Sequence, residues 1–181
     1  MTPTFPLAPV DASFLDTARH RYVFEIDLDA PADQVWAGLT ADEPQGWCRM
    51  LTDVRYTSPA PHRVGTSRRS VVARGVLSFR ERFFVWDEAV HHHAFYVEGM
   101  NVPLLRAFAE DYLIVPTERG CRLTWTIAFE SRRGFGTLVR LGLPAIAWLL
   151  RSLVKDTERA FTGPVTPSGS GLSRPSRGSA R

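Results

Sequence analysis

The chain has 181 residues, of which 44% are hydrophobic, so it is long enough for one sizeable core and short for two. The formal net charge is +3. Residues 163–181 contribute all of it through Arg174, Arg177 and Arg181, so residues 1–162 have a net charge of zero. A nucleic-acid-binding protein normally shows a basic stripe on its folded domain, and this charge balance gives no support for one, so we expect no nucleic-acid partner.

The cysteines and the first residues bear on compartment and cofactors. Cys48 and Cys121 lie far apart and belong to no CxxC motif, so neither a disulfide framework nor a zinc knuckle is indicated. The start, MTPTFPLAPVDASFLD, has no charged segment leading into an apolar one and does not resemble a signal peptide. We therefore expect a cytoplasmic protein with reduced thiols and no cofactor. Lys155 is the only lysine beside many arginines, a bias typical of GC-rich, actinobacterial-like coding.

Residues 1–19 form a proline-containing N-terminal arm, and the folded domain is expected to span residues 20–162. The domain opens with apolar residues that alternate with polar ones, which predicts a half-buried strand: Tyr22, Phe24, Ile26 and Leu28. A helix follows over residues 31–40, where Pro31 suits the first turn. The segment DEPQGWC is predicted to form a second, broken helical turn.

Residues 51–131 read as successive strands, and the last two are joined by the hairpin loop TERG. No crossover helix separates them, so the sheet should be antiparallel. Such a sheet needs one face covered, and only the long helix predicted over residues 134–162 is long enough to do so. The sequence thus predicts an α+β domain in which a curved sheet wraps a C-terminal helix. Residues 163–181 are rich in Gly, Ser, Pro and Arg and are expected to form a disordered tail.

Several segments resemble the START-like (SRPBCC) superfamily, and within it the bacterial polyketide cyclase/dehydrase-like proteins. The resemblance rests on FEIDLDAPADQVWAGLTADEPQGWC, RERFFVWDEA, GCRLTWTIAFE and the long last helix. It implies a helix-grip fold: a seven-stranded antiparallel sheet around the C-terminal helix, with two short helices after the first strand. Members hold lipids, sterols, hormones or polyketide intermediates in an apolar cavity between sheet and helix. They include enzymes, carriers and receptors, so the fold alone does not decide the function.

Bulky apolar side chains on the predicted strands and helix would line such a cavity. The alternative is that the same side chains fill a solid core. The residues expected at a ligand are Trp47, Phe83, Tyr96, Glu98, Met100, Leu105, Arg106, Leu113, Trp125, Ile127, Leu141, Ala145, Trp148 and Leu149.

Carboxylates on the predicted strands are candidates for acid/base chemistry. Glu81, Glu98, Glu110 and Asp111 each lie beside apolar residues, and the alternative for each is an outward carboxylate paired with an arginine. The cyclases of the superfamily orient a polyketone with polar groups, so the resemblance suggests that Glu98 and Arg106 orient an oxygenated ligand. If the protein is an enzyme, the predicted catalytic set is Glu81, Glu98, Arg106 and Asp111.

Two further motifs suggest chemistry that the sequence does not support. His91 and His93 would share one strand face, but no third ligand accompanies them, so we expect a solvated strand end and no metal site. RGFGTLV resembles a dinucleotide-binding turn, yet Val139 stands at the third glycine position and no strand follows.

The last predicted helix contains the apolar stretch RLGLPAIAWLLR. Its apolar part ends at arginines on both sides and is shorter than the roughly 20 apolar residues of a membrane span, so no transmembrane span is expected. Two apolar stripes share this helix. We expect the first, Leu138, Leu141, Ala145, Trp148 and Leu149, to face the sheet. The second would stay exposed: Val139, Leu143, Ile146, Leu150 and Leu153.

Three functions remain open from the sequence. The leading hypothesis is a protein that binds a small hydrophobic ligand, lipid or polyketide-like, between sheet and helix. The second is a polyketide cyclase or dehydratase-type enzyme. The third is a protein that docks on a partner, a second copy or a membrane surface through the exposed apolar face of its last helix.

Overall fold

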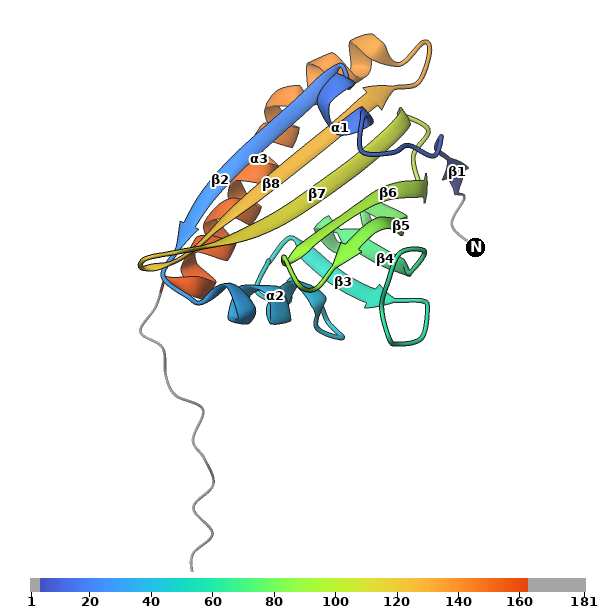
Figure 1. The fold of residues 1–181 in the computed structure, drawn as a ribbon. Coiled ribbons are helices and arrows are strands. Elements are labelled where there is room, and N and C mark those ends of the chain that lie inside the picture. Colours follow the sequence, from blue (N-terminus) through green and yellow to red (C-terminus); the bar gives the residue numbers. More distant parts are fainter. Residues whose placement is uncertain (1–3, 163–181) are drawn as a thin grey trace, which may run out of the picture.

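A computed structural model describes residues 4–162 as a curled antiparallel sheet with one long and two short helices (Figure 1). The strands are β1 (Phe5–Pro6), β2 (His20–Leu28), β3 (Leu51–Tyr56), β4 (Ser67–Val72), β5 (Leu77–Asp87), β6 (His92–Met100), β7 (Leu105–Thr117) and β8 (Gly120–Ser131). The helices are α1 (Phe14–Thr17), α2 (Ala32–Thr40) and α3 (Gly136–Phe161), with a 3-10 turn at Ala73–Gly75.

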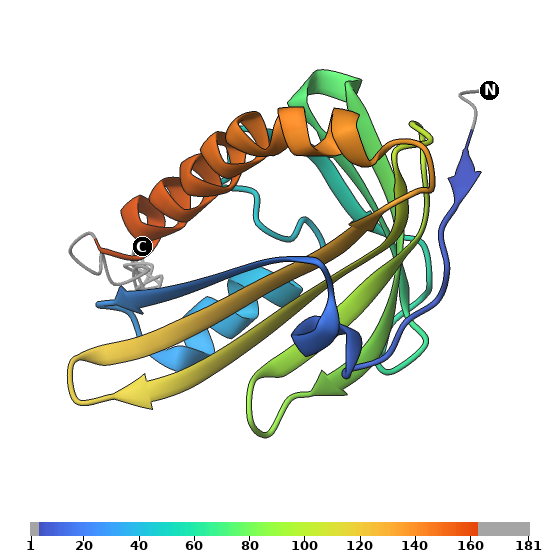
Figure 2. The ribbon, with the colours of Figure 1, turned by 90° about the horizontal axis from the view of Figure 1, so that it is seen from above.

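The sheet runs in the order β2-β8-β7-β6-β5-β4-β3, and every pairing is antiparallel. Figure 2 shows α3 lying along the concave side of this sheet. The helix-grip fold predicted from the sequence is therefore confirmed. One detail differs, because α2 is the only helix that follows β2, and bends and turns replace the second short helix at residues 41–47.

The N-terminal arm packs onto the domain rather than away from it. Strand β1 extends the sheet by pairing Phe5 with Met100 of β6. Helix α1 places Phe14 and Leu15 over small alanines on the convex face, Ala107, Ala109 and Ala128. These alanines leave room for the aromatic ring, so the convex face is covered where the arm crosses it. The tail predicted at residues 163–181 lies outside the described residues.

The main core fills the space between the concave face and the helices. Val35 and Leu39 of α2 and Val139, Leu150 and Leu153 of α3 pack there against inward side chains of the sheet. Register shifts interrupt the pairing of β5 with β6 and of β7 with β8. Because side chains alternate between faces with a period of two, each such shift changes which residues point inward.

The rotation of α3 corrects the sequence prediction. The stripe expected to be exposed is the inward one, since Val139, Leu150 and Leu153 are buried. From the stripe expected inside, Leu141 is 75% exposed and Trp148 is 63% exposed, whereas Leu138, Ala145 and Leu149 still border the space between sheet and helix. Both stripes have helical spacing, so periodicity alone could not choose between them. The choice is made at the far end of the helix, where Asp156, Thr157 and Phe161 are buried against the rest of the domain.

Candidate ligand cavity

A cavity of about 350 Å³ lies between the concave face and α3. Its walls are mostly apolar, with Leu104, Phe108, Trp125 and Ile127 from the sheet side and a run of α3 residues opposite. That run includes Leu138, Gly142, Ala145, Ile146, Leu149 and Leu153. Gly142 contributes no side chain, and a Cβ atom placed there would meet nothing within 4 Å. The missing side chain therefore keeps part of the cavity open.

A buried ion pair forms one polar part of the cavity wall. Arg68 on β4 lies directly opposite Glu81 on β5, and its Nε donates to Glu81 Oε2 at 2.6 Å. The two side chains are only 3% and 5% exposed. The central carbon of the guanidinium also lies 4.7 Å from the ring centre of Phe95. This cation–π contact stabilises a positive charge that is buried away from water. Tyr56 also lies near the guanidinium, but within residues 4–162 no hydrogen bond of ordinary geometry reaches the terminal N–H groups, so these can serve a ligand.

A second polar part is centred on Glu110 of β7. Tyr112 Oη donates to Glu110 Oε2 at 2.6 Å, and Trp125 Nε1 donates to the same oxygen at 2.9 Å. Gln45 Nε2 in turn donates to Tyr112 Oη at 3.2 Å. Both carboxyl bonds use Oε2, and no group among the described residues bonds Oε1. All four residues line the cavity.

Burial raises the pKa of Glu110 to about 7, against the hydrogen bonds from Tyr112 and Trp125 that favour the charged form. At neutral pH the carboxyl group is therefore present both with and without its proton. It can donate a hydrogen bond to a ligand oxygen in one state and accept one in the other. The same burial raises the pKa of Tyr112 well above its ordinary value, so its hydroxyl stays protonated.

The histidine triplet has three different environments. His91 Nε2 lies 3.1 Å from Asp33 Oδ1, and His92 Nε2 lies 2.6 Å from Asp111 Oδ1. His93 is 1% exposed and packs among aromatic rings, so the expectation of a solvated strand end is wrong for this residue. Burial and the charge of Arg68 lower its pKa well below the ordinary value, which keeps it neutral. No group of three metal-ligating side chains occurs in the part of the chain that the structure describes.

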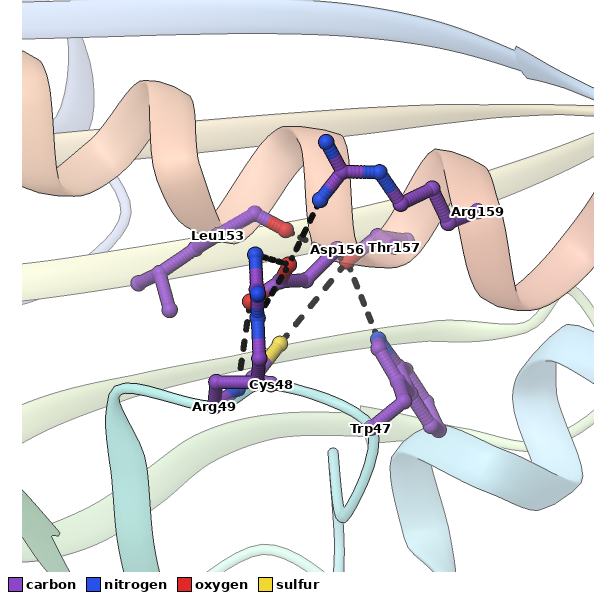
Figure 3. A network of polar contacts seen from close by, with 7 residues as sticks. All are labelled: Trp47, Cys48, Arg49, Leu153, Asp156, Thr157 and Arg159. Atoms are coloured by element: carbon purple, nitrogen blue, oxygen red, sulfur yellow. Dashed lines mark hydrogen bonds and ion pairs between the residues drawn. The ribbon is translucent and has the colours of Figure 1, made fainter.

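The loop that carries Gln45 is fastened to α3 by a separate polar network (Figure 3). Arg49 donates from its backbone N to Asp156 Oδ2 at 3.1 Å and from Nη2 to Asp156 Oδ1 at 3.0 Å. Arg159 also donates to Asp156, and Trp47 Nε1 donates to Thr157 Oγ1 at 3.1 Å. We refer to these five residues, Trp47, Arg49, Asp156, Thr157 and Arg159, as the α3 anchor. The α3 anchor fixes the loop and the helix relative to each other at one end of the cavity.

Comparison with known proteins shows which family this chain belongs to. Residues 19–161 match the family model described as "Polyketide cyclase / dehydrase and lipid transport". The chain belongs to this family. It is 36% identical over 158 residues to an uncharacterized protein of Mycobacterium tuberculosis (strain ATCC 25618 / H37Rv), with 86% of this chain and 92% of the relative covered. The same identity and coverage hold for an uncharacterized protein of Mycobacterium bovis.

Solved structures agree on the fold of this family member. The Zhui aromatase/cyclase from Streptomyces sp. R1128 matches with a TM-score of 0.60 at 16% identity, over 77% of this chain and 94% of that chain. Ara h 8.0201 matches with a TM-score of 0.62 at 12% identity, over 78% of this chain and 97% of that chain. At such identities the likeness shows the fold alone. The START-like resemblance is confirmed, and family and neighbours support a fold that binds hydrophobic ligands.

Seven of the sixteen residues predicted for the site line the cavity. Glu81 is on its wall, paired with an arginine as the alternative interpretation had it, but buried. The ligand-binding candidates among the lining residues are Met100, Leu105, Trp125, Ile127, Ala145 and Leu149. These side chains come from β6, β7, β8 and α3, so the structure brings together segments that are far apart in the sequence.

The polar candidates other than Glu81 and Glu110 face away from the cavity, which corrects their predicted placement. Glu98 Oε1 accepts from Arg82 Nε at 2.5 Å, Arg106 pairs with Glu130, and Asp111 pairs with His92. Tyr96 packs near α1 on the convex side, and Leu113 is likewise absent from the cavity wall. The cause is the register shift at residues 105–107 of β7 and the one near Glu98 in β6, because each puts the next alternate residues on the opposite face.

Four apolar candidates also lie outside the cavity wall. Phe83 is fully buried behind Arg68, and Trp47 belongs to the α3 anchor. Leu141 and Trp148 face outward from α3 because of the helix rotation described above. In their place the structure adds polar groups that the predicted site did not contain: Gln45, Arg68, Ser70, Glu110 and Tyr112. The sequence signal for Glu110 was present, since it was one of four strand carboxylates, but only the register could separate it from Asp111.

Proposed function

We propose that this protein binds one small, mainly apolar molecule whose oxygen-bearing head group lies between Arg68 and Glu110. The observation that supports this most directly is unused hydrogen-bonding capacity inside an apolar cavity. The terminal N–H groups of Arg68 and Oε1 of Glu110 have no partner among residues 4–162, and both residues line the cavity. A carbonyl or carboxylate oxygen can accept from Arg68, and it can also accept from Glu110 when that carboxyl group carries its proton.

The energetics favour a ligand with a polar end. A buried polar group without a partner costs about 1–3 kcal/mol, and more when it is charged. A ligand oxygen that accepts from Arg68 removes part of that cost, while the apolar remainder covers Trp125, Ile127 and the α3 wall. A volume of about 350 Å³ is within the usual range for small-molecule sites. A lipid or a polyketide-like molecule has the required chemistry.

A second candidate function, catalysis of the cyclase or dehydratase type, rests on Glu110. A carboxyl group with a pKa of about 7 can take a proton from a carbon next to a carbonyl and return it at neutral pH. Arg68 would stabilise the oxygen that becomes negative when that proton leaves. In this interpretation Glu110 takes the acid/base role, Glu81 holds Arg68, and Glu98, Arg106 and Asp111 have no part.

Gly142 offers a direct test of binding. Gly142→Phe extends a ring into the open part of the cavity, whereas Gly142→Ala removes the glycine and fills almost none of the space. With a fatty acid that fluoresces in apolar surroundings as the probe, we expect wild type and Gly142→Ala to bind and Gly142→Phe to lose at least about tenfold in affinity. Equal affinity for all three would show that the probe binds elsewhere and would refute the proposal.

Arg68→Gln tests the head group. We expect the variant to bind the fatty-acid probe more weakly, with a larger loss of affinity than for an uncharged apolar probe of the same length, because only the acid binds the guanidinium.

Glu110→Gln separates the two candidate functions. If the protein is a cyclase, this variant still binds a short β-polyketone but no longer converts it; if it is a binder, neither wild type nor variant converts it.

A further inference from the structure

The outward side of α3 carries an apolar surface that no element of the described chain covers. It consists of Leu138, Leu141, Ala145 and Trp148, and we refer to it as the α3 ridge. Leu141 is 75% exposed, Trp148 is 63% exposed and Leu138 is 54% exposed. Their spacing of three and four residues puts them in one line along the helix.

Basic side chains accompany the α3 ridge, with no acidic side chain among them. From Ser131 to Lys155 the sequence contains five basic residues and no Asp or Glu, and four of the basic residues are exposed: Arg133, Arg140, Arg151 and Lys155. Arg19, from the segment before β2, lines the same recess at the start of α3 as Arg140. The first acids after this stretch are Asp156, which is buried in the α3 anchor, and Glu158. Within residues 131–155 the surface is therefore apolar along its centre, and all of its exposed charged side chains are basic.

The α3 ridge is also continuous with the cavity. Leu138 and Ala145 belong to both, because they line the cavity and lie on the ridge. Gly142 lies between them in the sequence and has no side chain to separate the cavity from the ridge. A molecule leaving the cavity past α3 would therefore pass along apolar side chains.

We propose that the α3 ridge docks on the surface of an anionic lipid bilayer. An amphipathic helix with Trp and Leu on one side and Arg or Lys at the border has the composition of a helix that lies in the membrane interface. The positive border complements anionic head groups. A second copy of the chain fits less well, because a symmetric contact through α3 would bring the same basic side chains of both copies together.

The helix lies on the membrane in this arrangement and does not cross it. By length and composition alone α3 could span a bilayer. Its C-terminal end is held by Asp156 and Thr157 to the loop at Arg49 and Trp47, and its inward face lines the cavity. Docking through the ridge keeps these contacts, whereas insertion would break them.

Vesicle co-sedimentation of the full chain tests this inference. The probes are vesicles of phosphatidylcholine with phosphatidylglycerol and vesicles of phosphatidylcholine alone. We expect binding to the anionic vesicles that weakens as salt is added, and little binding to the neutral ones. Absence of binding to anionic vesicles, or equal binding to both kinds, would overturn the proposal.

Two pairs of variants locate the contact. Leu141→Ser/Trp148→Ser should lose at least about tenfold in vesicle affinity, whereas the control Val64→Ser/Val115→Ser, at exposed valines away from α3, should not. Arg140→Glu/Arg151→Glu should lose at least about 30-fold, more than the control Arg63→Glu/Arg119→Glu of equal net charge. Equal losses in variant and control would place the contact elsewhere and overturn the proposal.

A dimer that forms in solution and is broken by Leu141→Ser/Trp148→Ser would likewise overturn it, because a second copy would then cover the ridge. The inference does not depend on the ligand proposed above. Vesicle binding that persists in Gly142→Phe, together with loss of the fatty-acid probe, separates the two proposals.

Discussion

The two faces of the sheet carry Arg–Glu pairs of almost the same geometry in very different surroundings. On the cavity face Arg68 and Glu81 are 2.6 Å apart and 3% and 5% exposed. On the convex face Arg82 and Glu98 are 2.5 Å apart and 42% and 29% exposed. Distance therefore does not distinguish the two pairs, but access to water does.

The difference in exposure to water indicates that the Arg68–Glu81 pair, rather than the Arg82–Glu98 pair, takes part in ligand binding. The convex pair is screened by water and contributes little. The cavity pair has lost its hydration, and a buried ion pair is often no more stabilising than apolar side chains of the same size. Its position beside an apolar cavity, with terminal N–H groups of Arg68 unused, is explained if a ligand completes the hydrogen bonding.

Breaking the ion pair between Arg68 and Glu81 is expected to change the free energy of unfolding the most. Glu81→Gln leaves the charge of Arg68 buried without a counter-charge, so we expect the free energy of unfolding to fall by about 3–5 kcal/mol in urea denaturation. The matched change on the convex face, Glu98→Gln, should cost less than about 1 kcal/mol. Similar losses for both variants would mean that burial does not separate the two faces.

The next effect concerns the pH dependence that Glu110 gives to stability. Its pKa is about 7 in the folded protein and near 4.5 when unfolded, so the folded state binds more protons between these values. Stability should therefore fall as pH rises through this window. From about pH 5 to pH 8 we expect wild type to lose about 2–3 kcal/mol relative to Glu110→Gln, measured by urea denaturation at each pH. Parallel curves for the two proteins would contradict the assigned pKa.

A smaller effect is expected at Asp156, a buried carboxylate whose oxygens are bonded by Arg49 and Arg159. Asp156→Asn weakens these charge-assisted hydrogen bonds but leaves no cavity, so we expect a loss of about 1–3 kcal/mol. Amide exchange should accelerate in residues 45–49, because that loop is fastened to α3 through Asp156. Unchanged exchange there would show that the anchor does not hold the loop.

The sequence predicted the architecture well because its signals are local. Alternation in β2 and β8, the hairpin loop between β7 and β8 and the length of the last helix are each contained in one segment. Together with the resemblance, they were sufficient for a helix-grip fold.

The site was predicted only in part because its polar residues depend on register. Glu110 and Asp111 are neighbours with similar sequence surroundings, and the shift at residues 105–107 of β7 sends the first inward and the second outward. Arg68 and Arg69 pose the same problem on β4. The rotation of α3 likewise depends on Asp156 and its partner Arg49, two residues far apart in the sequence. Periodicity finds that two faces exist, whereas long-range contacts decide which one is buried.

The central claim is that the cavity between the sheet and α3 holds an apolar molecule with an oxygen-bearing head. Native mass spectrometry of the full chain purified from its own host, followed by extraction, tests this most directly. We expect one ligand per chain in wild type and in Gly142→Ala, with an oxygen-bearing head group in the extract, and none in Gly142→Phe. Wild-type protein without a ligand, or a ligand retained equally by Gly142→Phe, would contradict the account.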